Sequence, residues 1–247
     1  KIMGNCLVTK LKGVVNNDNL RKLGCIQFKK HTTGDFVFTI IGNGGDITVK
    51  CSDGRSFLAD SIPVNTYTIH NTVPRQFNFD GSGYNIEISG KENITTAGGS
   101  GAAYMMDISD LNGCRGLIGW TLNSPSYANG SIDDLYAIDN IETLVFQVPG
   151  GINGHIESLS ICPNIATLTI NDNLNIVGDW CTLVRQLYAG GKTSGSIHID
   201  WVGSTKNIKF NGTTVVNTGD GNLAWSSDTG KITLTVTGTE TPYEANL

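Results

Sequence analysis

The sequence predicts a mainly β fold with short helices, in which a solenoid of 24-residue repeats lies between β-rich capping regions. Two observations lead to this fold class. The 247 residues include 31 glycines and only 16% charged residues, which is typical of short strands joined by tight turns. In the middle of the chain, apolar residues recur with a constant period, as in an array whose units stack on one another.

Chain length, net charge and apolar runs indicate a globular protein that binds neither nucleic acid nor the membrane interior. A chain of 247 residues can bury a sizeable core. The formal net charge is -5 and the longest basic cluster is only residues 29–31, so nucleic acid is not an expected partner. No apolar run approaches the ~20 residues that span a bilayer, so we expect no membrane insertion. Residues 1–13 lack an apolar signal core, and the compartment is left open.

The N-terminal region, residues 1–103, has the pattern of hairpins and meanders and is expected to be a β-rich cap or a separate domain. Its strand candidates are residues 36–41, 46–50, 66–70, 76–79 and 85–89. Glycine-rich segments between them are expected to be turns, namely "GNGG" from Gly42, "DGSGY" from Asp80 and "GGSG" from Gly98.

The repeat covers residues 104–188. The segment from Gly130 to Asn153 is followed without a gap by a similar one from Gly154, and a third begins at Gly178. Apolar residues share columns 24 positions apart: Ile108, Ile132, Ile156, Trp180; Leu111, Leu135, Leu159, Leu183; Cys114, Ile138, Cys162; Leu117, Ile141, Ile165; Trp120, Leu144, Leu168; Leu122, Phe146, Ile170. Neighbouring units would bury these columns as continuous ridges, with the strands of Leu144 and Leu168 side by side and parallel.

The last three columns spell L-x-x-L-x-L, and each unit opens with Gly-x-Ile or Gly-x-Trp, so this third of the chain resembles the leucine-rich repeat family. The position where the family places a ladder asparagine is occupied by Pro125, Pro149 and Asn173. The resemblance implies a stacked array whose sheet faces a partner.

The array is expected to end in a helix that begins after Asp179 and stops at Gly190 and Gly191. The Gly-Lys-Thr that follows is similar to the end of a nucleotide-binding phosphate loop. Such a loop needs a further glycine at the position of Gln186, and it lies before a helix rather than after one. We therefore expect a helix-ending turn there, with Lys192 near the negative end of the helix, and no cofactor.

Residues 189–247 are expected to form a β-rich C-terminal cap. Its strand candidates are residues 196–201, 207–210, 213–216 and 230–236.

The six cysteines form no C-x-x-C pair and have no histidine at metal-ligand spacing, so no metal site is expected. Cys114 and Cys162 share a column but lie two units apart, too far for a disulfide. We expect them to be buried free thiols.

Titratable residues offer no recognisable nucleophile. The four histidines are His31, His70, His155 and His198, none of them at a known catalytic spacing. His198 and Asp200 are expected on the outward side of a strand, either paired with each other or without a role. Two acidic columns, Asp110 with Asp134, and Ser109 with Asp133 and Glu157, predict an acidic edge. Such acids favour helix N-termini; calcium binding and a pair of glycosidase carboxylates are the alternatives.

The polar residues between the apolar columns are the candidate binding surface. They are small and nearly uncharged and should cover the exposed face of a sheet: Thr121, Asn123, Glu142, Thr143, Gln147, Thr167, Thr169 and Asn171. Such a face suits hydrogen bonding to a protein or a neutral glycan, or self-association.

The sequence therefore predicts a non-enzymatic interaction or structural module. The alternative is a carbohydrate-active β-solenoid enzyme that uses surface carboxylates. The whole chain also resembles uncharacterised surface-displayed and prophage-associated proteins of gut Bacteroidetes, which implies an adhesin-like or virion-associated role.

Overall fold

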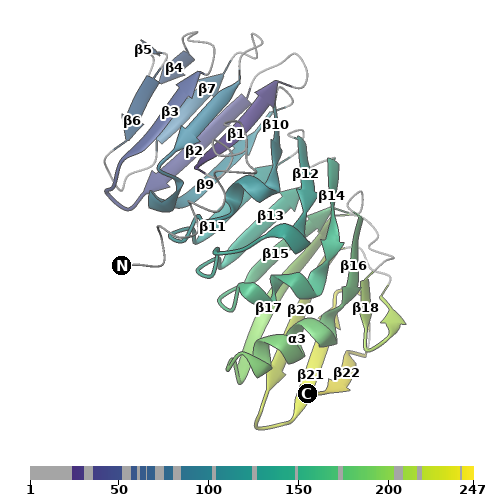
Figure 1. The fold of residues 1–247 in the computed structure, drawn as a ribbon. Coiled ribbons are helices and arrows are strands. Elements are labelled where there is room, and N and C mark those ends of the chain that lie inside the picture. The colour runs from purple at the N-terminus through teal and green to yellow at the C-terminus, as the bar shows by residue number, and fades with distance from the viewer. Residues whose placement is uncertain are drawn as a thin grey trace, which may run out of the picture.

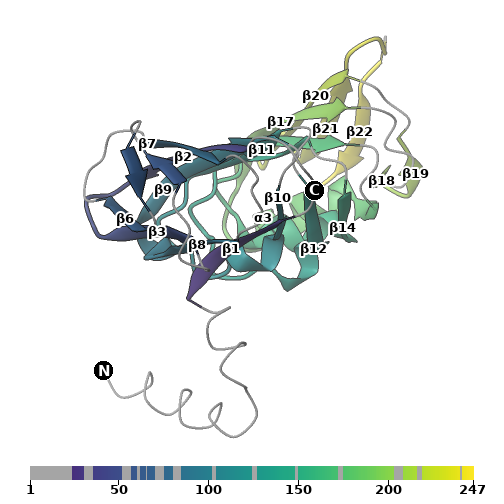
Figure 2. The ribbon, with the colours of Figure 1, turned by 90° about the horizontal axis from the view of Figure 1, so that it is seen from above.

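The computed structural model describes residues 24–30, 36–51, 57–59, 62–64, 66–69, 75–79, 85–101, 104–123, 127–147, 150–171, 175–202, 208–215, 219–239 and 241–247. Two large mixed β sheets face each other along an elongated body, with the N-terminal strands at one end and the C-terminal strands at the other (Figures 1 and 2). One continuous apolar core lies between them. The predicted mainly β class is confirmed.

The first sheet has ten strands. Their order is β19 (Thr213–Thr214), β18 (Ile208–Phe210), β16 (Asn175–Asp179), β14 (Gly150–His155), β12 (Tyr127–Ser131), β10 (Tyr104–Asp107), β1 (Cys25–Lys30), β8 (Ile86–Ser89), β3 (Ile47–Cys51) and β6 (Thr66–Ile69).

The second, longer sheet has twelve strands. Their order is β22 (Tyr243–Asn246), β21 (Lys231–Val236), β20 (Gly219–Ser226), β17 (Ser194–Val202), β15 (Thr167–Asn171), β13 (Thr143–Gln147), β11 (Gly119–Asn123), β9 (Ile94–Ser100), β2 (Phe36–Gly42), β7 (Arg75–Phe79), β4 (Phe57–Ala59) and β5 (Ile62–Val64).

Short helices lie one below another along one edge of the body (Figure 1). They are η2 (Ile108–Leu111), η3 (Ile132–Asp134), η4 (Ile156–Ile161) and α3 (Trp180–Ala189), while η1 (Lys91–Asn93) lies in the N-terminal region. Among the described residues, no helix has both the length and the apolar character needed to cross a bilayer.

The central strands of the long sheet pair in the predicted register. Trp120 on β11 is the partner of Leu144 on β13, and Leu144 is the partner of Leu168 on β15. All three side chains are at most 1% exposed. The predicted parallel pairing of the strands that contain Leu144 and Leu168 is therefore confirmed.

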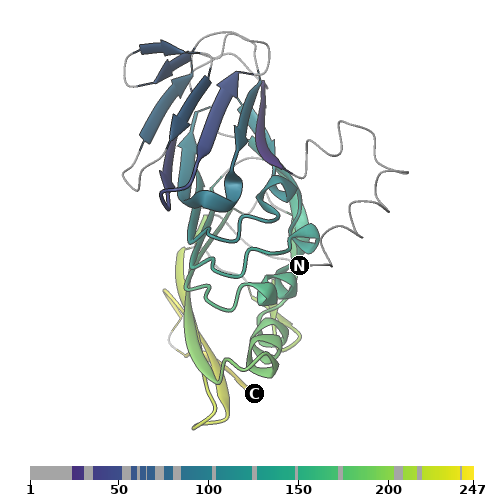
Figure 3. The ribbon, with the colours of Figure 1, turned by 60° about the vertical axis from the view of Figure 1, so that its left-hand side comes forward.

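A second row of parallel strands, β10, β12, β14 and β16, closes the other side and was not predicted. Gly130, Gly154 and Gly178 lie in its last three strands, with φ angles of 105°, 117° and 115°, a region that favours glycine. A Cβ atom on Gly154 would lie 2.8 Å from Ile132 Cγ1 of the preceding unit. Glycine at this column therefore lets neighbouring units approach closely. Figure 3 shows the similar connections between the two rows.

Most flanking strands lie where the sequence predicts them, but one turn is wrong. The "GNGG" segment does bend after β2, whereas Gly98 to Ser100 of "GGSG" belong to β9. A Cβ atom on Gly99 would lie 2.8 Å from ring atoms of both Phe36 and Phe38. These glycines therefore allow aromatic rings to pack on a strand. The "DGSGY" segment, His31 and His70 lie outside the described residues.

The end of the array has the predicted order of helix, turn and strand. The Asp179 carboxylate caps α3 by accepting from Cys181 N at 2.8 Å, and Gly190 and Gly191 follow the helix before β17 begins. Lys192 lies at the end of the helix, where its backbone N–H donates to the Leu187 carbonyl at 3.0 Å. Its side chain donates to the Pro163 carbonyl of the preceding unit.

Lys192 thereby extends a column of contacts between units. The Asn140 side chain donates to the Arg115 carbonyl at 2.6 Å, and the Asn164 side chain donates to the Asp139 carbonyl at 3.5 Å. The accepting carbonyls of Arg115, Asp139 and Pro163 lie 24 residues apart. The lysine of Gly-Lys-Thr therefore links neighbouring units through a hydrogen bond.

Cys114 and Cys162 are free and buried thiols, as expected. Burial raises the pKa of both to about 12, so neither is a nucleophile at neutral pH. Cys25 and Cys181 are also buried thiols, and neither is in a disulfide. The side chains of Cys6 and Cys51 lie outside the described part of the chain.

Candidate functional site

The structure brings most of the predicted surface residues together on the outer face of the long sheet. Thr121 and Thr169 each pair with Val145 between them, and Asn123 pairs with Gln147. Because all three strands are parallel and in step, residues of one column lie side by side. Thr143 and Thr167 form the next row along the strands.

Exposure differs among these residues. Asn123 and Glu142 are exposed, while Thr121, Thr143, Gln147 and Thr167 are partly buried. Thr169 is only 4% exposed, so it is a poor contact residue, contrary to the prediction. It lies between Val145 and Asp200 on the neighbouring strands. The backbone of Asn171 lies in β15, and its side chain is not among those described.

The same face continues onto β17 and β20. His198 and Asp200 point outward as predicted, while Ile197 and Ile199 are fully buried. The two outward residues do not pair with each other: His198 Nε2 lies 3.8 Å from Asp220 Oδ1, and Gln147 Nε2 donates to Asp200 at 3.4 Å.

Beside them lies an open hollow of about 210 Å³, lined by His198, Asp220, Gly221, Asn222, Thr235, Val236 and Thr237. Sequence reasoning missed this lining because β20, which supplies Asp220, Gly221 and Asn222, was not among the predicted strands.

One predicted acidic column has a structural role. Asp133 accepts from His155 N at 2.8 Å and from Ser158 Oγ at 2.5 Å, and Glu157 accepts from Asp179 N at 2.7 Å. Each carboxylate thus bonds the backbone of the next unit. Such bonds match the interpretation of these acids as stabilising groups near short helices.

His155 also pairs with Asp133 through Nδ1, at 2.9 Å. This hydrogen bond raises the pKa of His155. Partial burial opposes ionisation of Asp133, but the bonds from Ser158 and His155 outweigh it and lower its pKa. The histidine side chain is 61% exposed.

The other acidic column does not form an edge. Asp134 is exposed, whereas Asp110 is only 6% exposed. The two residues occupy equivalent positions in successive units, but β1 of the N-terminal region covers Asp110, and Gln27 N donates to its Oδ2 at 3.0 Å. The expected acidic edge of Asp110 and Asp134 is therefore wrong, because only Asp134 is exposed.

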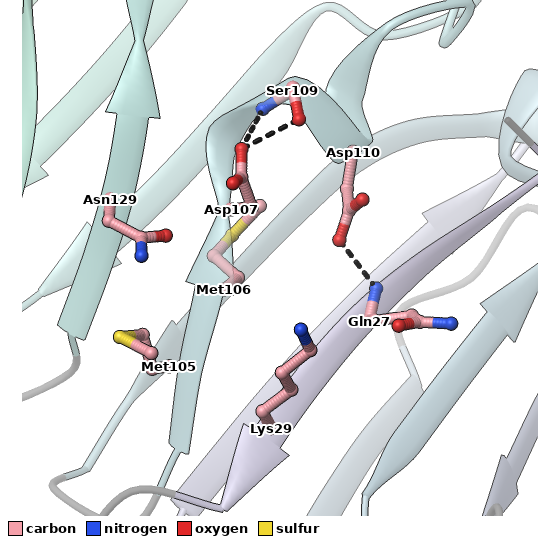
Figure 4. A pocket seen from close by; sticks show the side chains of 8 residues that line it. All are labelled: Gln27, Lys29, Met105, Met106, Asp107, Ser109, Asp110 and Asn129. Carbon is pink, nitrogen blue, oxygen red and sulfur yellow. Dashed lines mark hydrogen bonds between the residues drawn. The ribbon is translucent and has the colours of Figure 1, made fainter. Parts of the chain in front are cut away.

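Asp110 instead lines a small pocket of about 70 Å³ (Figure 4). The lining comes from β1, β10, η2 and β12: Gln27, Lys29, Met105, Met106, Asp107, Ser109, Asp110 and Asn129. Asp107 Oδ1 accepts from Ser109 N at 2.9 Å and from Ser109 Oγ at 2.6 Å. The pocket therefore has two carboxyl groups from one short helix and its cap.

Burial raises the pKa of Asp110 to about 6, although the hydrogen bond from Gln27 N acts in the opposite direction. The nearby Asp107 carboxylate adds to the rise, and Lys91 and Lys29 reduce it. Lys91 is itself buried and donates to the Asp110 backbone carbonyl at 2.9 Å. A carboxyl group in this environment is partly protonated near neutral pH.

Within the described residues, no three His, Cys, Asp or Glu side chains are grouped so as to hold a metal ion. Comparisons of the chain with protein-family models, with curated proteins and with solved structures found no match.

Proposed function

We propose that the chain is a non-enzymatic interaction or structural module. Residues 104–188 would form a leucine-rich-repeat-like solenoid of 24-residue units, between a cap of residues 1–103 and a cap of residues 189–247. The module presents the outer face of the long sheet to a protein or a neutral glycan. An adhesin-like role at a cell surface, or a role in a virion, would suit such a surface.

The observation that supports this proposal most is the register of β11, β13 and β15. Partners 24 residues apart lie side by side, so the short polar side chains of each unit add to one surface. Thr121, Thr143 and Thr167 provide hydroxyl groups, and Asn123 and Gln147 provide amides. Few charges interrupt them, and an uncharged face is desolvated at lower cost than a charged one.

Charge introduced on this face tests the proposal. Thr143→Arg and Gln147→Arg place a long cation in the middle of the face, and Asn153→Arg places one at an exposed position of the other sheet. We measure binding on a glycan array and self-association by sedimentation. Both face variants should weaken the interaction by about tenfold or more, and the control should not. Equal behaviour of all three variants would contradict the proposal.

The alternative, a carbohydrate-active enzyme, has one feature in its favour. Asp107 and Asp110 line the same pocket, and one of them has a raised pKa, as in glycosidase acid–nucleophile pairs. However, the pocket of about 70 Å³ is far smaller than the ~300 Å³ at which ligand sites usually begin. In addition, Gln27 N occupies one oxygen of Asp110. We therefore rank binding first.

Hydrolysis assays on oligosaccharides separate the two functions. Turnover that Asp110→Asn and Asp107→Asn abolish, while Asp134→Asn leaves it intact, would establish the enzyme. Absence of turnover together with binding through the sheet face would support the module.

A further inference from the structure

The pocket beside Asp110 lies where two strands separate. The antiparallel ladder of β1 and β10 runs from Lys30 and Tyr104 to Phe28 and Met106, and stops there. Gln27 continues along β8 instead, and its N–H turns to the Asp110 carboxylate. We call this point, where β1 leaves β10, the fork. Here the backbone N–H of β1 bonds a side chain, that of Asp110, rather than the backbone of β10.

Asp110 has hydrogen-bonding capacity left in this fork. Its side chain is buried, yet only Oδ2 accepts a bond among the described residues, from Gln27 N. No group among the described residues donates to the other oxygen, Oδ1, and Asp110 lines the pocket. Oδ1 is not one of the fully buried polar atoms that lack a partner, so it can be reached from the pocket and can accept a hydrogen bond from a group that enters there.

The remaining lining decides which donor fits. Figure 4 shows Lys29 from β1, Asn129 from β12 and Asp110 from η2 directed toward the same space. A cationic ligand would meet the Lys29 ammonium, and an anionic ligand would meet the carboxylates of Asp107 and Asp110. A hydroxyl group both donates and accepts, so it can satisfy a carboxylate, an ammonium and an amide together. The Met105 thioether adds an apolar wall for the carbon atoms that carry such groups.

We infer that this fork pocket, formed by Gln27, Lys29, Met105, Asp107, Asp110 and Asn129, is a subsite for the hydroxyl groups at the end of a neutral saccharide. A volume of about 70 Å³ admits a hydroxymethyl group or two neighbouring hydroxyls rather than a whole sugar ring. The inference rests on the proposed function in that it takes the partner to be a glycan. It assigns that glycan a contact on the sheet opposite to the proposed face.

The test follows the Gln27 amide signal by NMR in the full chain, because this N–H touches the Asp110 carboxylate. The probes are methyl glycosides of galactose, glucose and mannose at millimolar concentrations, with inorganic phosphate and ethylamine as charged comparators. At least one glycoside should shift the signal saturably. Lys29→Gln and Asn129→Ala should each weaken that binding about tenfold, and Asp134→Asn should leave it unchanged.

Two results would overturn the subsite. One is a Gln27 signal that no glycoside moves, or that only phosphate or ethylamine moves. The other is binding that Lys29→Gln and Asn129→Ala leave at wild-type strength. Both variants change accessible side chains, so both should fold as the wild type does. Thermal melting followed by circular dichroism checks that they are folded. If Thr143→Arg abolishes partner binding while Lys29→Gln does not, the subsite is wrong and the proposed function stands.

Discussion

At each end of the row of parallel strands, the side chain of one aspartate accepts hydrogen bonds from the backbone of the flanking region. We call these two contacts the N-terminal joint (Asp110) and the C-terminal joint (Asp179), and they differ. At the C-terminal joint, the Asp179 carboxylate accepts from three backbone N–H groups: Cys181 at 2.8 Å, Asn211 at 3.1 Å and Gly212 at 2.6 Å. At the N-terminal joint, Gln27 N is the one donor to the Asp110 carboxyl among the residues that the structure describes.

Local backbone geometry explains the difference. Asn211 and Gly212 have φ angles of 48° and 82°, and this turn directs both N–H groups at Asp179. Asp110 instead meets one N–H of a strand whose other backbone groups belong to the sheet. The C-terminal joint is thus built for stability, while the N-terminal joint has a free oxygen in a pocket. The fork pocket, to which we assign the proposed subsite, therefore lies at the N-terminal joint.

Both joints depend on a constant 24-residue register between neighbouring units. A one-residue shift of this register should therefore lower the free energy of unfolding more than any other change considered. Deleting Asp139, which is exposed, moves every later column of that unit out of register while removing no core side chain. We expect a loss of more than about 4 kcal/mol, measured by urea unfolding. Deleting residues 132–155, a whole unit, should cost less because the register survives. A larger loss for the whole-unit deletion would contradict the stacking of units.

The C-terminal joint is tested by Asp179→Ala and Ser131→Ala, which remove helix-capping side chains at the same column. Asp179 accepts three hydrogen bonds, whereas the Ser131 hydroxyl accepts one, from Asp133 N at 3.2 Å. We expect a loss of about 2–4 kcal/mol for the first variant and about 1 kcal/mol for the second, measured by urea unfolding. Equal losses would show that the β18–β19 turn contributes nothing through Asp179.

The contribution of Asp110 to folding stability should depend on pH in the opposite sense to that of most carboxylates, whose pKa is lowered by folding. Folding raises the pKa of Asp110 from 3.8 to about 6, so its contribution is fully present below pH 3.8 and is lost as the pH rises through about 6. The cost of the charged form is on the order of 2–3 kcal/mol above that range. Asp110→Asn keeps an acceptor for Gln27 N and should therefore be more stable than the wild type at pH 8, with little difference at pH 4.

Urea unfolding at both pH values measures this effect, and Asp134→Asn is the matched control at the same column. A destabilised Asp110→Asn variant at pH 8 would show that the charged carboxylate stabilises the joint.

The smallest effect is expected at the His155 and Asp133 pair. Folding raises the pKa of the histidine and lowers that of the aspartate, so the pair is formed between the two values and is lost as the pH rises through that of His155. The histidine is largely exposed, so His155→Gln should change stability little. An NMR titration should place the His155 midpoint above the ordinary value, and Asp133→Asn should return it. An unshifted midpoint in the wild type would contradict the pairing.

Local patterns in the sequence predicted much of the fold. The apolar columns place β11, β13 and β15 in register, and α3 lies between its predicted caps at Asp179 and Gly190. The strands β12, β14 and β16 were missed because segments such as "YANGS" and "GGING" have few branched or aromatic residues. Their pairing depends on the stacked units on either side rather than on their own composition.

The candidate surface was predictable in part for the same reason. Residues such as Thr143 and Gln147 follow from alternation along strands, a property of the local sequence. The fork pocket could not be predicted from local sequence, because Gln27 and Asp110 are 83 positions apart. The equal column positions of Asp110 and Asp134 suggested equal surroundings, but burial depends on β1, which only the three-dimensional structure brings there.

The central claim is that consecutive units lie side by side in parallel at a spacing of 24 residues. Cross-strand NOEs between backbone protons of Thr121, Val145 and Thr169 measure this directly. The structure predicts contacts from Val145 to both threonines in a parallel pattern. Antiparallel contacts, or contacts to residues at any other spacing, would contradict the structure and the surface built on it.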